Sequence, residues 1–221
     1  MVIETPSIFL SFDDFWIDEW HDTLPLFVKY GVLATFYLAF SQGNNVYDMT
    51  PERWKKLKEI EDAGHAIGYH GWNHLSADVV IRNKGCQGYL ESEVYPGLER
   101  MAKHGFYPKH FCYPYGHCNE ESHACLLEHF DTLRGYEIKD GEKVKYTPDE
   151  VRNHRVLDAF DIRDNQGEWQ AIMTSAINEK KVGFFFAHNP SAGGTFGKVR
   201  ELVVMGKRHG VKFCPMSVLD R

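Results

Sequence analysis

The sequence lacks the segments that would place it in a membrane or mark it for export. None of its 221 residues fall in an apolar run approaching the roughly 20 residues of a spanning helix. The first residues, MVIETPSIFLSFDD, contain no basic stretch followed by an apolar one, which is the pattern of a secretory signal. These absences predict a protein with no membrane span and, by default, a cytoplasmic location.

Cysteine is sparse, and no ordered cysteine framework is visible. The five cysteines are odd in number and irregularly spaced, which is unlike a disulfide-rich secreted domain. This pattern predicts free thiols in a reducing compartment. The cysteines are Cys86, Cys112, Cys118, Cys125 and Cys214.

Positive charge is in deficit. Lys and Arg number 25 against 31 Asp and Glu, so the formal net charge is -6, and no basic block stands out. Nucleic-acid binding depends on clustered Lys and Arg, so a nucleic-acid partner is not expected. The composition leaves the oligomeric state open.

Hydrophobic and aromatic residues are well represented. They make up 43% and 14% of the chain, and histidine occurs 12 times. The length and hydrophobic content predict one globular domain spanning residues 1–221. Histidine is the commonest metal ligand, and aromatic side chains suit the walls of a sugar site.

Short apolar runs alternate with amphipathic stretches along the chain, as in a parallel α/β protein. A helix capped by Thr50, with Pro51 at its first position, is expected to end at Gly64. Residues 131–165 are expected to be rich in loops. Strands are expected at 8–12, 34–40, 65–69, 109–115, 182–187 and 211–214, and further helices at 86–104, 121–130, 168–179 and 197–209, with Pro96 interrupting the first of these.

These alternating elements predict a single-domain, distorted (β/α) barrel with about seven parallel strands. The active site of such a barrel lies at the carboxyl ends of its strands. Four polar clusters follow strand-like runs and would therefore meet at one rim. They are Asp13-Asp14, His70 with His74, Tyr113-Pro114-Tyr115-Gly116, and His188.

His70 and His74 are four residues apart, so on a helical turn both imidazoles lie on one face and can share a cation. The alternative is a pair of surface or capping histidines. An aspartate from another strand would complete a set of ligands that leaves positions open for water and substrate.

Asp13 and Asp14 are adjacent and would point to opposite sides of a strand, one towards a metal and the other towards a water molecule. The alternative is a helix cap or an Asx turn after the strand. His188, at a strand end, is a candidate acid or base, and its alternative is a buried core histidine. Trp16 and Trp20 are expected to stack on a sugar, and the alternative is that Ile17 and Trp20 form the buried face of a short helix.

These residues resemble the motifs of the polysaccharide deacetylase family, carbohydrate esterase family 4. Ser11-Phe12-Asp13-Asp14 is similar to its first motif, and His70-Gly71-Trp72-Asn73-His74 to its second. Tyr113-Pro114-Tyr115-Gly116 resembles the third and Phe185-Phe186-Ala187-His188 the last. The matches are in order and span residues 8 to 189.

The resemblance implies a division of roles. Asp14, His70 and His74 would bind a divalent metal, commonly Zn²⁺, with Co²⁺, Ni²⁺ or Fe²⁺ as other candidates. Asp13 would be the general base, His188 would protonate the leaving amine, and the backbone N–H of Tyr115 would stabilise the oxyanion. Substrate contacts are expected from Trp16, Trp72, Tyr113, Pro114, Arg134 and Arg155.

The chain also departs from the family pattern. Many members carry an arginine that faces the catalytic aspartate, and Cys112 occupies the matching position here. Arg134 or Arg155 could supply the missing cation. Gly71 replaces the usual hydroxyl residue of the second motif. The aspartate that tunes the acid histidine has three candidates, which are Asp158, Asp161 and Asp164.

The function implied is removal of an N-acetyl group from an acetamido sugar. A lipid- or nucleotide-linked glycan precursor is expected as the carbohydrate substrate, because no secretory signal is visible. One alternative is hydrolysis of another amide, such as a cyclic imide or ureide. Another is a carbohydrate-binding pseudoenzyme that keeps the barrel.

Overall fold

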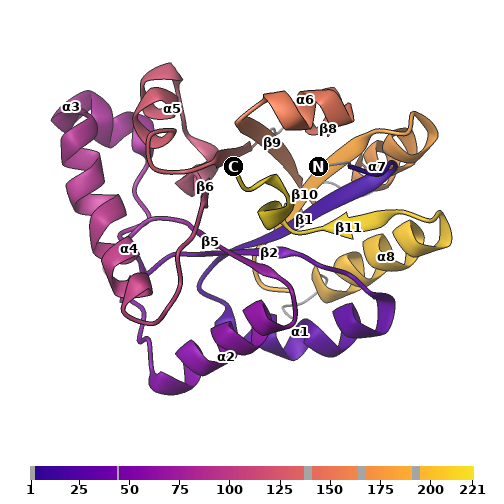
Figure 1. Cartoon of the computed structure of the whole chain (residues 1–221), viewed down its shortest axis with the longest axis horizontal. Helices are drawn as coiled ribbons and strands as arrows, with labels where there is room; N and C mark the ends of the chain where they lie inside the picture. The colour runs from indigo at the N-terminus through magenta and orange to yellow at the C-terminus, as the bar shows by residue number, and fades with distance from the viewer. Residues whose placement is uncertain (1–2, 44, 137–140, 164–167, 191–194) are drawn as a thin grey trace.

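Seven parallel strands form a closed barrel at the centre of the molecule (Figure 1). The computed structural model describes residues 3–43, 45–136, 141–163, 168–190 and 195–221. Pairing of the last barrel strand with the first closes the ring, which confirms the predicted barrel. In spatial order the strands are β1 (Ser7–Asp14), β2 (Thr35–Leu38), β5 (Ala66–Tyr69), β6 (His110–Cys112), β7 (Thr132–Tyr136), β9 (Val156–Asp161) and β10 (Val182–Ala187).

Shorter strands extend this barrel and distort it. β11 (Lys212–Cys214) runs parallel to the first part of β1, opposite Ser7–Phe9, whereas β2 pairs with β1 only from Ser11 onward. One edge of β1 is therefore shared by two strands. β8 (Lys145–Tyr146) pairs antiparallel with β10, and β3 (Ser41–Gln42) and β4 (Asn45–Val46) form a separate hairpin.

Helices surround the barrel (Figure 1). α2, α1 and α8 lie along one side in that view, and α3 and α4 lie along another. Among the described residues, no helix combines the length and the apolar character needed to cross a membrane. The helices are α1 (Ile17–Tyr30), α2 (Pro51–Asp62), α3 (Ala77–Tyr89), α4 (Tyr95–Ala102), α5 (Glu120–Leu126), α6 (Pro148–Asn153), α7 (Glu168–Asn178) and α8 (Thr195–Arg208).

The start and end of α2 follow from its terminal residues. The Thr50 hydroxyl accepts a hydrogen bond from the Arg53 N–H at 3.3 Å. Pro51 fits in the first turn because a backbone N–H at that position has no partner within the helix. Gly64 follows the last turn with φ of 93°, a conformation that glycine adopts readily. The predicted caps of this helix are confirmed.

The hydrophobic core has two parts because each barrel strand is buried on both faces. Ile8, Leu10 and Phe12 of β1 belong to the layer between barrel and helices. Phe9 belongs to a second cluster that fills the barrel, where its ring stacks on Phe184 at 4.7 Å. Asp13 continues the inward-facing series of Phe9, so the alternation of β1 directs its carboxylate into the barrel.

Two predictions for secondary structure are wrong. The region 131–165 contains β7 and β9, which charged, inward-facing residues such as Arg134 and Asp161 made hard to recognise as buried strands. The helix expected at 86–104 begins at Ala77 instead. It is interrupted by a backbone break at Gly85 (φ 72°) and by a π-helical turn, Leu90–Val94, which precedes Pro96.

The prediction of free thiols is wrong for two of the cysteines. Cys86 in α3 and Cys125 in α5 form a disulfide with a Cα–Cα distance of 5.8 Å, across a sequence separation of 39. Packing of α3 against α5 brings them together, which their spacing did not indicate. Cys112, Cys118 and Cys214 are free.

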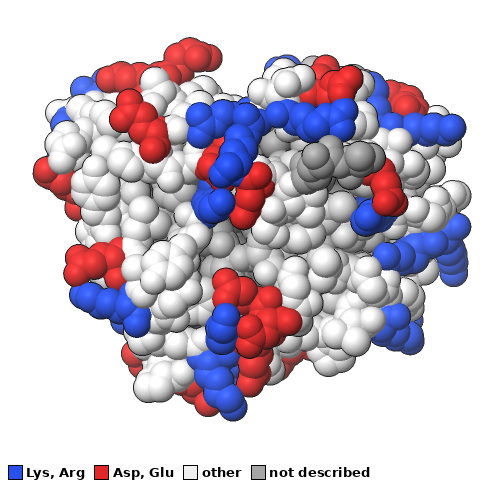
Figure 2. All heavy atoms as spheres, viewed as in Figure 1, with Lys and Arg blue, Asp and Glu red and all other residues white. Residues whose placement is uncertain are grey.

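Acidic and basic side chains lie next to one another on the face of the molecule drawn in Figure 2. Neither sign of charge dominates that face. The mixture agrees with the modest net charge of -6.

Candidate active site

A cavity of about 270 Å³ opens at the carboxyl ends of the barrel strands. The polar clusters predicted from the sequence contribute to its wall, because parallel strands deliver their ends to the same rim. The lining residues are Asp13, Asp14, Gln42, His70, His74, Tyr113, Tyr115, Gly116, Arg134, Tyr136, Asp161, Arg163, Phe186 and His188.

Asp14, His70 and His74 converge in this cavity. Asp14 Oδ1 lies 3.5 Å from His70 Nε2 and 3.3 Å from His74 Nε2, and the two Nε2 atoms are 3.1 Å apart. The Nδ1–H of His70 donates to the Cys112 carbonyl at 2.8 Å. Because a carbonyl can only accept, this bond assigns the proton to Nδ1 and leaves the Nε2 lone pair facing the other two residues.

This arrangement suits a tetrahedral cation. Ligand atoms about 2.0–2.1 Å from Zn²⁺ lie about 3.3 Å from one another in a tetrahedron, which is the spacing of the three atoms here. Asp13 Oδ1, Asp14 Oδ1 and His188 Nδ1 are buried without a hydrogen-bond partner among the described residues. Buried polar atoms in this position need a ligand or water, because desolvation without a partner costs free energy.

The carboxylate of Asp14 carries its charge at neutral pH. Burial raises the pKa of Asp14, but the close imidazoles of His70 and His74, together with the charge of His70 and His188, outweigh this effect and hold the pKa below its usual range. The site therefore offers one anionic oxygen to a cation.

Unusual backbone conformations occur at three of these positions. Asp14, His74 and Tyr115 have φ of 80°, 57° and 58°, in the left-handed region that L-residues seldom adopt. Each costs about 1–3 kcal/mol and persists only where the surrounding structure holds it. At Asp14 the consequence is direct: the turn breaks the strand alternation, so Asp13 and Asp14 both line the cavity and do not point to opposite sides as expected.

Arg134, on the strand next to the one that carries Cys112, pairs with Asp13. Cys112 of β6 and Arg134 of β7 are paired in register, and the Arg134 guanidinium forms a buried ion pair with Asp13. The guanidinium also lies 4.3 Å from the centre of the Phe186 ring. Arg134 thus contacts the catalytic candidate Asp13, in addition to lining the cavity.

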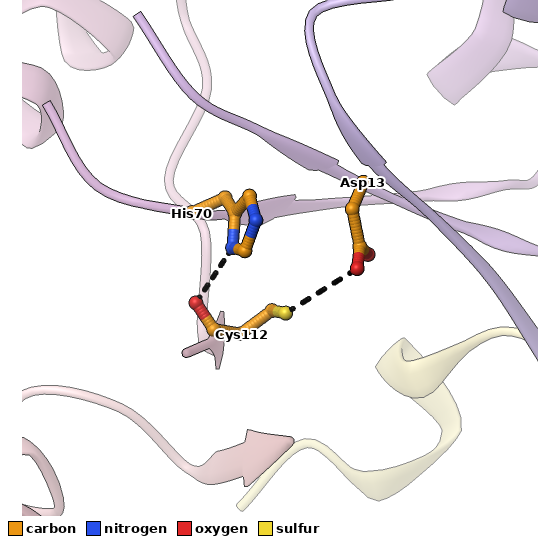
Figure 3. A group of neighbouring side chains, drawn as sticks. All are labelled: Asp13, His70 and Cys112. Carbon is orange, nitrogen blue, oxygen red and sulfur yellow. Dashed lines mark hydrogen bonds between the residues drawn. The ribbon is translucent and has the colours of Figure 1, made fainter. Parts of the chain in front are cut away.

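Asp13, His70 and Cys112 form a second group of neighbouring side chains (Figure 3). The Cys112 thiol lies 3.7 Å from Asp13 Oδ2, and the Cys112 carbonyl accepts the His70 hydrogen bond. Burial raises the pKa of the Cys112 thiol, so sulfur stays protonated, and Arg134 already neutralises Asp13. The Asp14 group is therefore the better cation site.

His188 faces the same cavity from the end of β10. Its Nε2 lies 3.8 Å from Asp14 Oδ2, and its carbonyl accepts a hydrogen bond from the Trp20 indole at 3.2 Å. Burial lowers the pKa of His188, while Asp13 and Asp14 oppose that effect. A histidine between two carboxylates and the cavity can exchange a proton with a bound substrate.

Of the aspartates considered as partners of His188, Asp161 lines the cavity. Its carboxylate binds the Arg163 guanidinium, with Nη2 at 2.6 Å, and influences His188 only through its charge. Asp158 lies in β9 with its backbone N–H bonded to the Tyr146 hydroxyl at 2.7 Å. Asp164 lies outside the described residues.

Tyr115 and its neighbours form the wall beside His74. The exposed Tyr115 ring meets the His74 ring edge-on, with 4.6 Å between centres. Tyr113 is buried, with its hydroxyl 2.9 Å from His123 Nδ1. Pro114 is buried next to Gly71, so its contact is with the second motif.

Besides Pro114, three residues expected to bind substrate are not among those that line the cavity. Trp16 is exposed before α1, and Trp72 packs on Phe40 with 5.0 Å between ring centres. Arg155 donates hydrogen bonds to the carbonyls of Leu127, Phe130 and Asp131, so it braces the loop before β7. These placements do not support a substrate contact. Trp20 is fully buried in α1, in agreement with the structural alternative.

Several residues of the site were not anticipated from the sequence. Gln42, Tyr136 and Arg163 line the cavity from segments whose positions depend on strand order. Glu93 is fully buried behind the His70–His74 segment. Glu93 could have been suspected from the sequence, because it is a charged residue in a helical stretch rich in apolar positions.

A parallel barrel with a cavity of this kind at the carboxyl ends of its strands defines the class of (β/α)-barrel enzymes. The family model described as polysaccharide deacetylase matches residues 3–129, which is more than half of the chain. The chain belongs to the polysaccharide deacetylase family. The matched range includes Asp13, Asp14, His70 and His74.

Solved structures with the same fold include a carbohydrate esterase and a chitin deacetylase. A family 4 carbohydrate esterase from Streptomyces lividans, in complex with acetate, has a TM-score of 0.63 at 18% identity and covers 97% of this chain and 95% of its own. The chitin deacetylase from Colletotrichum lindemuthianum has a TM-score of 0.59 at 13% identity, covering 99% and 90%. At these identities the likeness concerns the fold. The comparison with curated proteins found no match.

Proposed function

We propose that this protein is a metal-dependent hydrolase that removes an N-acetyl group from an acetamido sugar. The observation that carries the proposal is the convergence of Asp14, His70 and His74 at tetrahedral spacing, with Asp13 and His188 beside them in one cavity. Membership of the deacetylase family supports the same activity.

Asp14 and the Nε2 atoms of His70 and His74 would hold the cation. Two imidazoles and one carboxylate are donors that Zn²⁺ accepts readily, and Co²⁺, Ni²⁺ and Fe²⁺ bind the same set. When bound, a divalent cation would polarise the acetamide carbonyl and lower the pKa of a water molecule towards about 7.

The side chains around that position have distinct tasks. Asp13 Oδ1, which has no partner among the described residues, would accept the proton of the attacking water. The Tyr115 N–H would donate to the oxyanion, a contribution of roughly 3 kcal/mol in comparable sites. His188 would donate a proton to the leaving nitrogen, because an unprotonated amide nitrogen is a poor leaving group.

Arg134 would hold the Asp13 carboxylate in place. Its buried guanidinium binds Asp13 Oδ2, so Oδ1 is left without a partner among the described residues. The only support for a pseudoenzyme was the lack of an arginine at Cys112. The Asp13–Arg134 ion pair supplies a guanidinium from another strand, and so favours an active enzyme.

The substrate would be a carbohydrate whose acetamido group enters the cavity. Gln42, Tyr113 and Tyr136 offer polar and aromatic surface there. A cytoplasmic lipid- or nucleotide-linked precursor remains the prediction from the sequence, but the Cys86–Cys125 disulfide favours an oxidising compartment. Free and polymer-bound acetamido sugars therefore belong in the same substrate panel.

Acetate release from such a panel tests the proposal. The purified protein is expected to release acetate, to stop after chelation, and to recover when Zn²⁺ is added back. Acetate release that persists in metal-free protein would contradict the metal requirement. Binding of the sugars without acetate release would identify a pseudoenzyme, and turnover confined to cyclic imides or ureides would identify the other alternative.

Two variants separate the roles of the aspartates and histidines. Asp13→Asn is expected to lower turnover by about 10²- to 10⁴-fold while leaving zinc content nearly intact. His74→Ala is expected to lose both zinc and activity. Loss of zinc from folded Asp13→Asn protein would show that the two aspartates had been assigned the wrong roles. Circular dichroism checks that each variant folds.

A further inference from the structure

The π-helical turn Leu90–Val94 packs against the segment that carries His74. Four N–H groups of that segment donate to this turn. The Trp72 N–H donates to the Glu93 carbonyl at 3.0 Å, and the Asn73 side chain to the Ser92 carbonyl at 3.1 Å. The Asn73 and Leu75 N–H groups donate to Glu93 Oε2 at 2.9 and 3.2 Å.

Glu93 makes the central contacts. Besides the two backbone donors on Oε2, the Asn73 amide donates to Oε1 at 2.8 Å. The two backbone N–H groups belong to the residues on either side of His74, whose φ of 57° is strained. A carboxylate that binds both neighbours of a residue can hold that residue in a conformation it would otherwise leave.

The π-helical turn between α3 and α4 lies where Glu93 and Ser92 contact the His74 segment. Pro96 has no N–H to give to the Ser92 carbonyl, four residues earlier, so that carbonyl can accept from Asn73. The Tyr69 hydroxyl donates to the Glu93 carbonyl and takes a hydrogen bond from the Gly97 N–H. A Cβ at Gly97 would lie 2.0 Å from the Tyr69 hydroxyl, so glycine is needed there.

Gly71 completes the arrangement on the other side. Its φ is 93°, and a Cβ at this position would lie 3.2 Å from Glu93 Oε2 and 3.5 Å from Pro114. The family usually has a hydroxyl residue here, and in this chain glycine leaves that space to the Glu93 carboxylate.

We propose that Glu93 is a positioning residue that holds the His70–His74 segment in its metal-binding conformation before any cation arrives. The inference rests on the proposed function, in that Asp14, His70 and His74 are taken as the ligands. Glu93 touches none of these side chains and acts through the backbone of residues 73 and 75. Removing its carboxylate should weaken the site for the cation even where the barrel stays folded.

Zinc affinity of the metal-free protein, measured by competition with a chromophoric chelator, tests this role. Glu93→Gln keeps the volume but turns one oxygen into a donor that opposes the Asn73 amide, and we expect about 10- to 100-fold weaker zinc binding. Glu91→Gln is the matched control, because Glu91 lies in the same turn, is exposed, and accepts a hydrogen bond from the Gln87 side chain at 2.8 Å. It should bind zinc like the wild-type protein.

Two further readouts separate positioning from general stability. Amide hydrogen exchange at Asn73 and Leu75 should accelerate in metal-free Glu93→Gln, and urea unfolding reports the stability of the whole barrel. Lower stability with unchanged zinc affinity would overturn the proposal. If Glu93→Gln fails to fold, Glu93→Asp decides, because its shorter carboxylate cannot reach the Asn73 and Leu75 N–H groups as Glu93 does. Weaker zinc binding in folded Glu93→Asp protein supports the proposal, and unchanged binding overturns it. A wild-type protein that binds no zinc would instead refute the proposed function itself.

Discussion

At the scale of single residues, Cys112 and Arg134 lie side by side on neighbouring strands, and Arg134 pairs with Asp13. A guanidinium placed on β7 reaches the same aspartate as one on β6 would, because paired residues of adjacent parallel strands project in the same direction. For pairing with Asp13, the position of the guanidinium matters more than the strand that carries it.

Replacement of Arg134 should affect both activity and stability. Arg134→Gln leaves the buried Asp13 carboxylate without its partner, so we expect a loss of about 3–5 kcal/mol in unfolding free energy and about 10²-fold in kcat. Urea unfolding and acetate release measure the two effects. Arg155→Gln, far from the cavity, should lower stability and leave kcat unchanged.

The double variant Cys112→Arg with Arg134→Cys moves the charge to the family position. The Cys112 sulfur already lies 3.7 Å from Asp13 Oδ2, so an arginine there can reach the carboxylate. Most of the kcat lost in Arg134→Gln should return. A double variant as inactive as Arg134→Gln would show that Arg134 does more than pair with Asp13.

At the scale of elements, the disulfide between α3 and α5 ties together the segments that follow two of the site motifs. α3 begins shortly after His74, and α5 begins shortly after Tyr115. The crosslink closes a sequence separation of 39, so it restricts the unfolded chain between these positions.

Removing the disulfide should lower stability without abolishing the fold. For a loop of this length the chain-entropy relation gives about 4 kcal/mol for Cys86→Ala with Cys125→Ala. Urea unfolding with and without a reductant measures the effect. The reductant should destabilise the wild-type protein and leave the double variant unaltered; equal sensitivity in both proteins would assign the effect to another thiol.

At the scale of the whole molecule, stability should depend on pH through a histidine distant from the active site. His65 is buried, its Nδ1 accepts the Ala34 N–H at 3.0 Å, and its ring lies beside Phe27 and Phe36. Burial lowers the pKa of His65 to about 4, so the folded protein keeps this imidazole neutral.

The sign follows from proton uptake. Below about pH 6.5 the imidazole of His65 is protonated in the unfolded chain, but in the folded protein it is protonated only below about pH 4. The free energy of unfolding therefore falls as pH falls through this window, by at most about 3 kcal/mol. His65→Asn keeps an acceptor near Nδ1 and should flatten the decline between pH 7 and 5 in urea titrations. His209→Asn, at an exposed position, is the control; an equal decline in all three proteins would contradict this assignment.

The sequence alone determined the class of fold and most of the candidate site. Asp13, Asp14, His70, His74, Tyr115 and His188 each follow an apolar run in a short local pattern, and parallel strands bring such positions to one rim. Only the tertiary structure decided that Arg134 pairs with Asp13, that Glu93 supports the His74 segment, and that Cys86 bonds to Cys125. These contacts depend on strand register and helix packing between residues distant in the chain. The side on which Asp14 points likewise depends on a strained φ angle that the surrounding structure must hold.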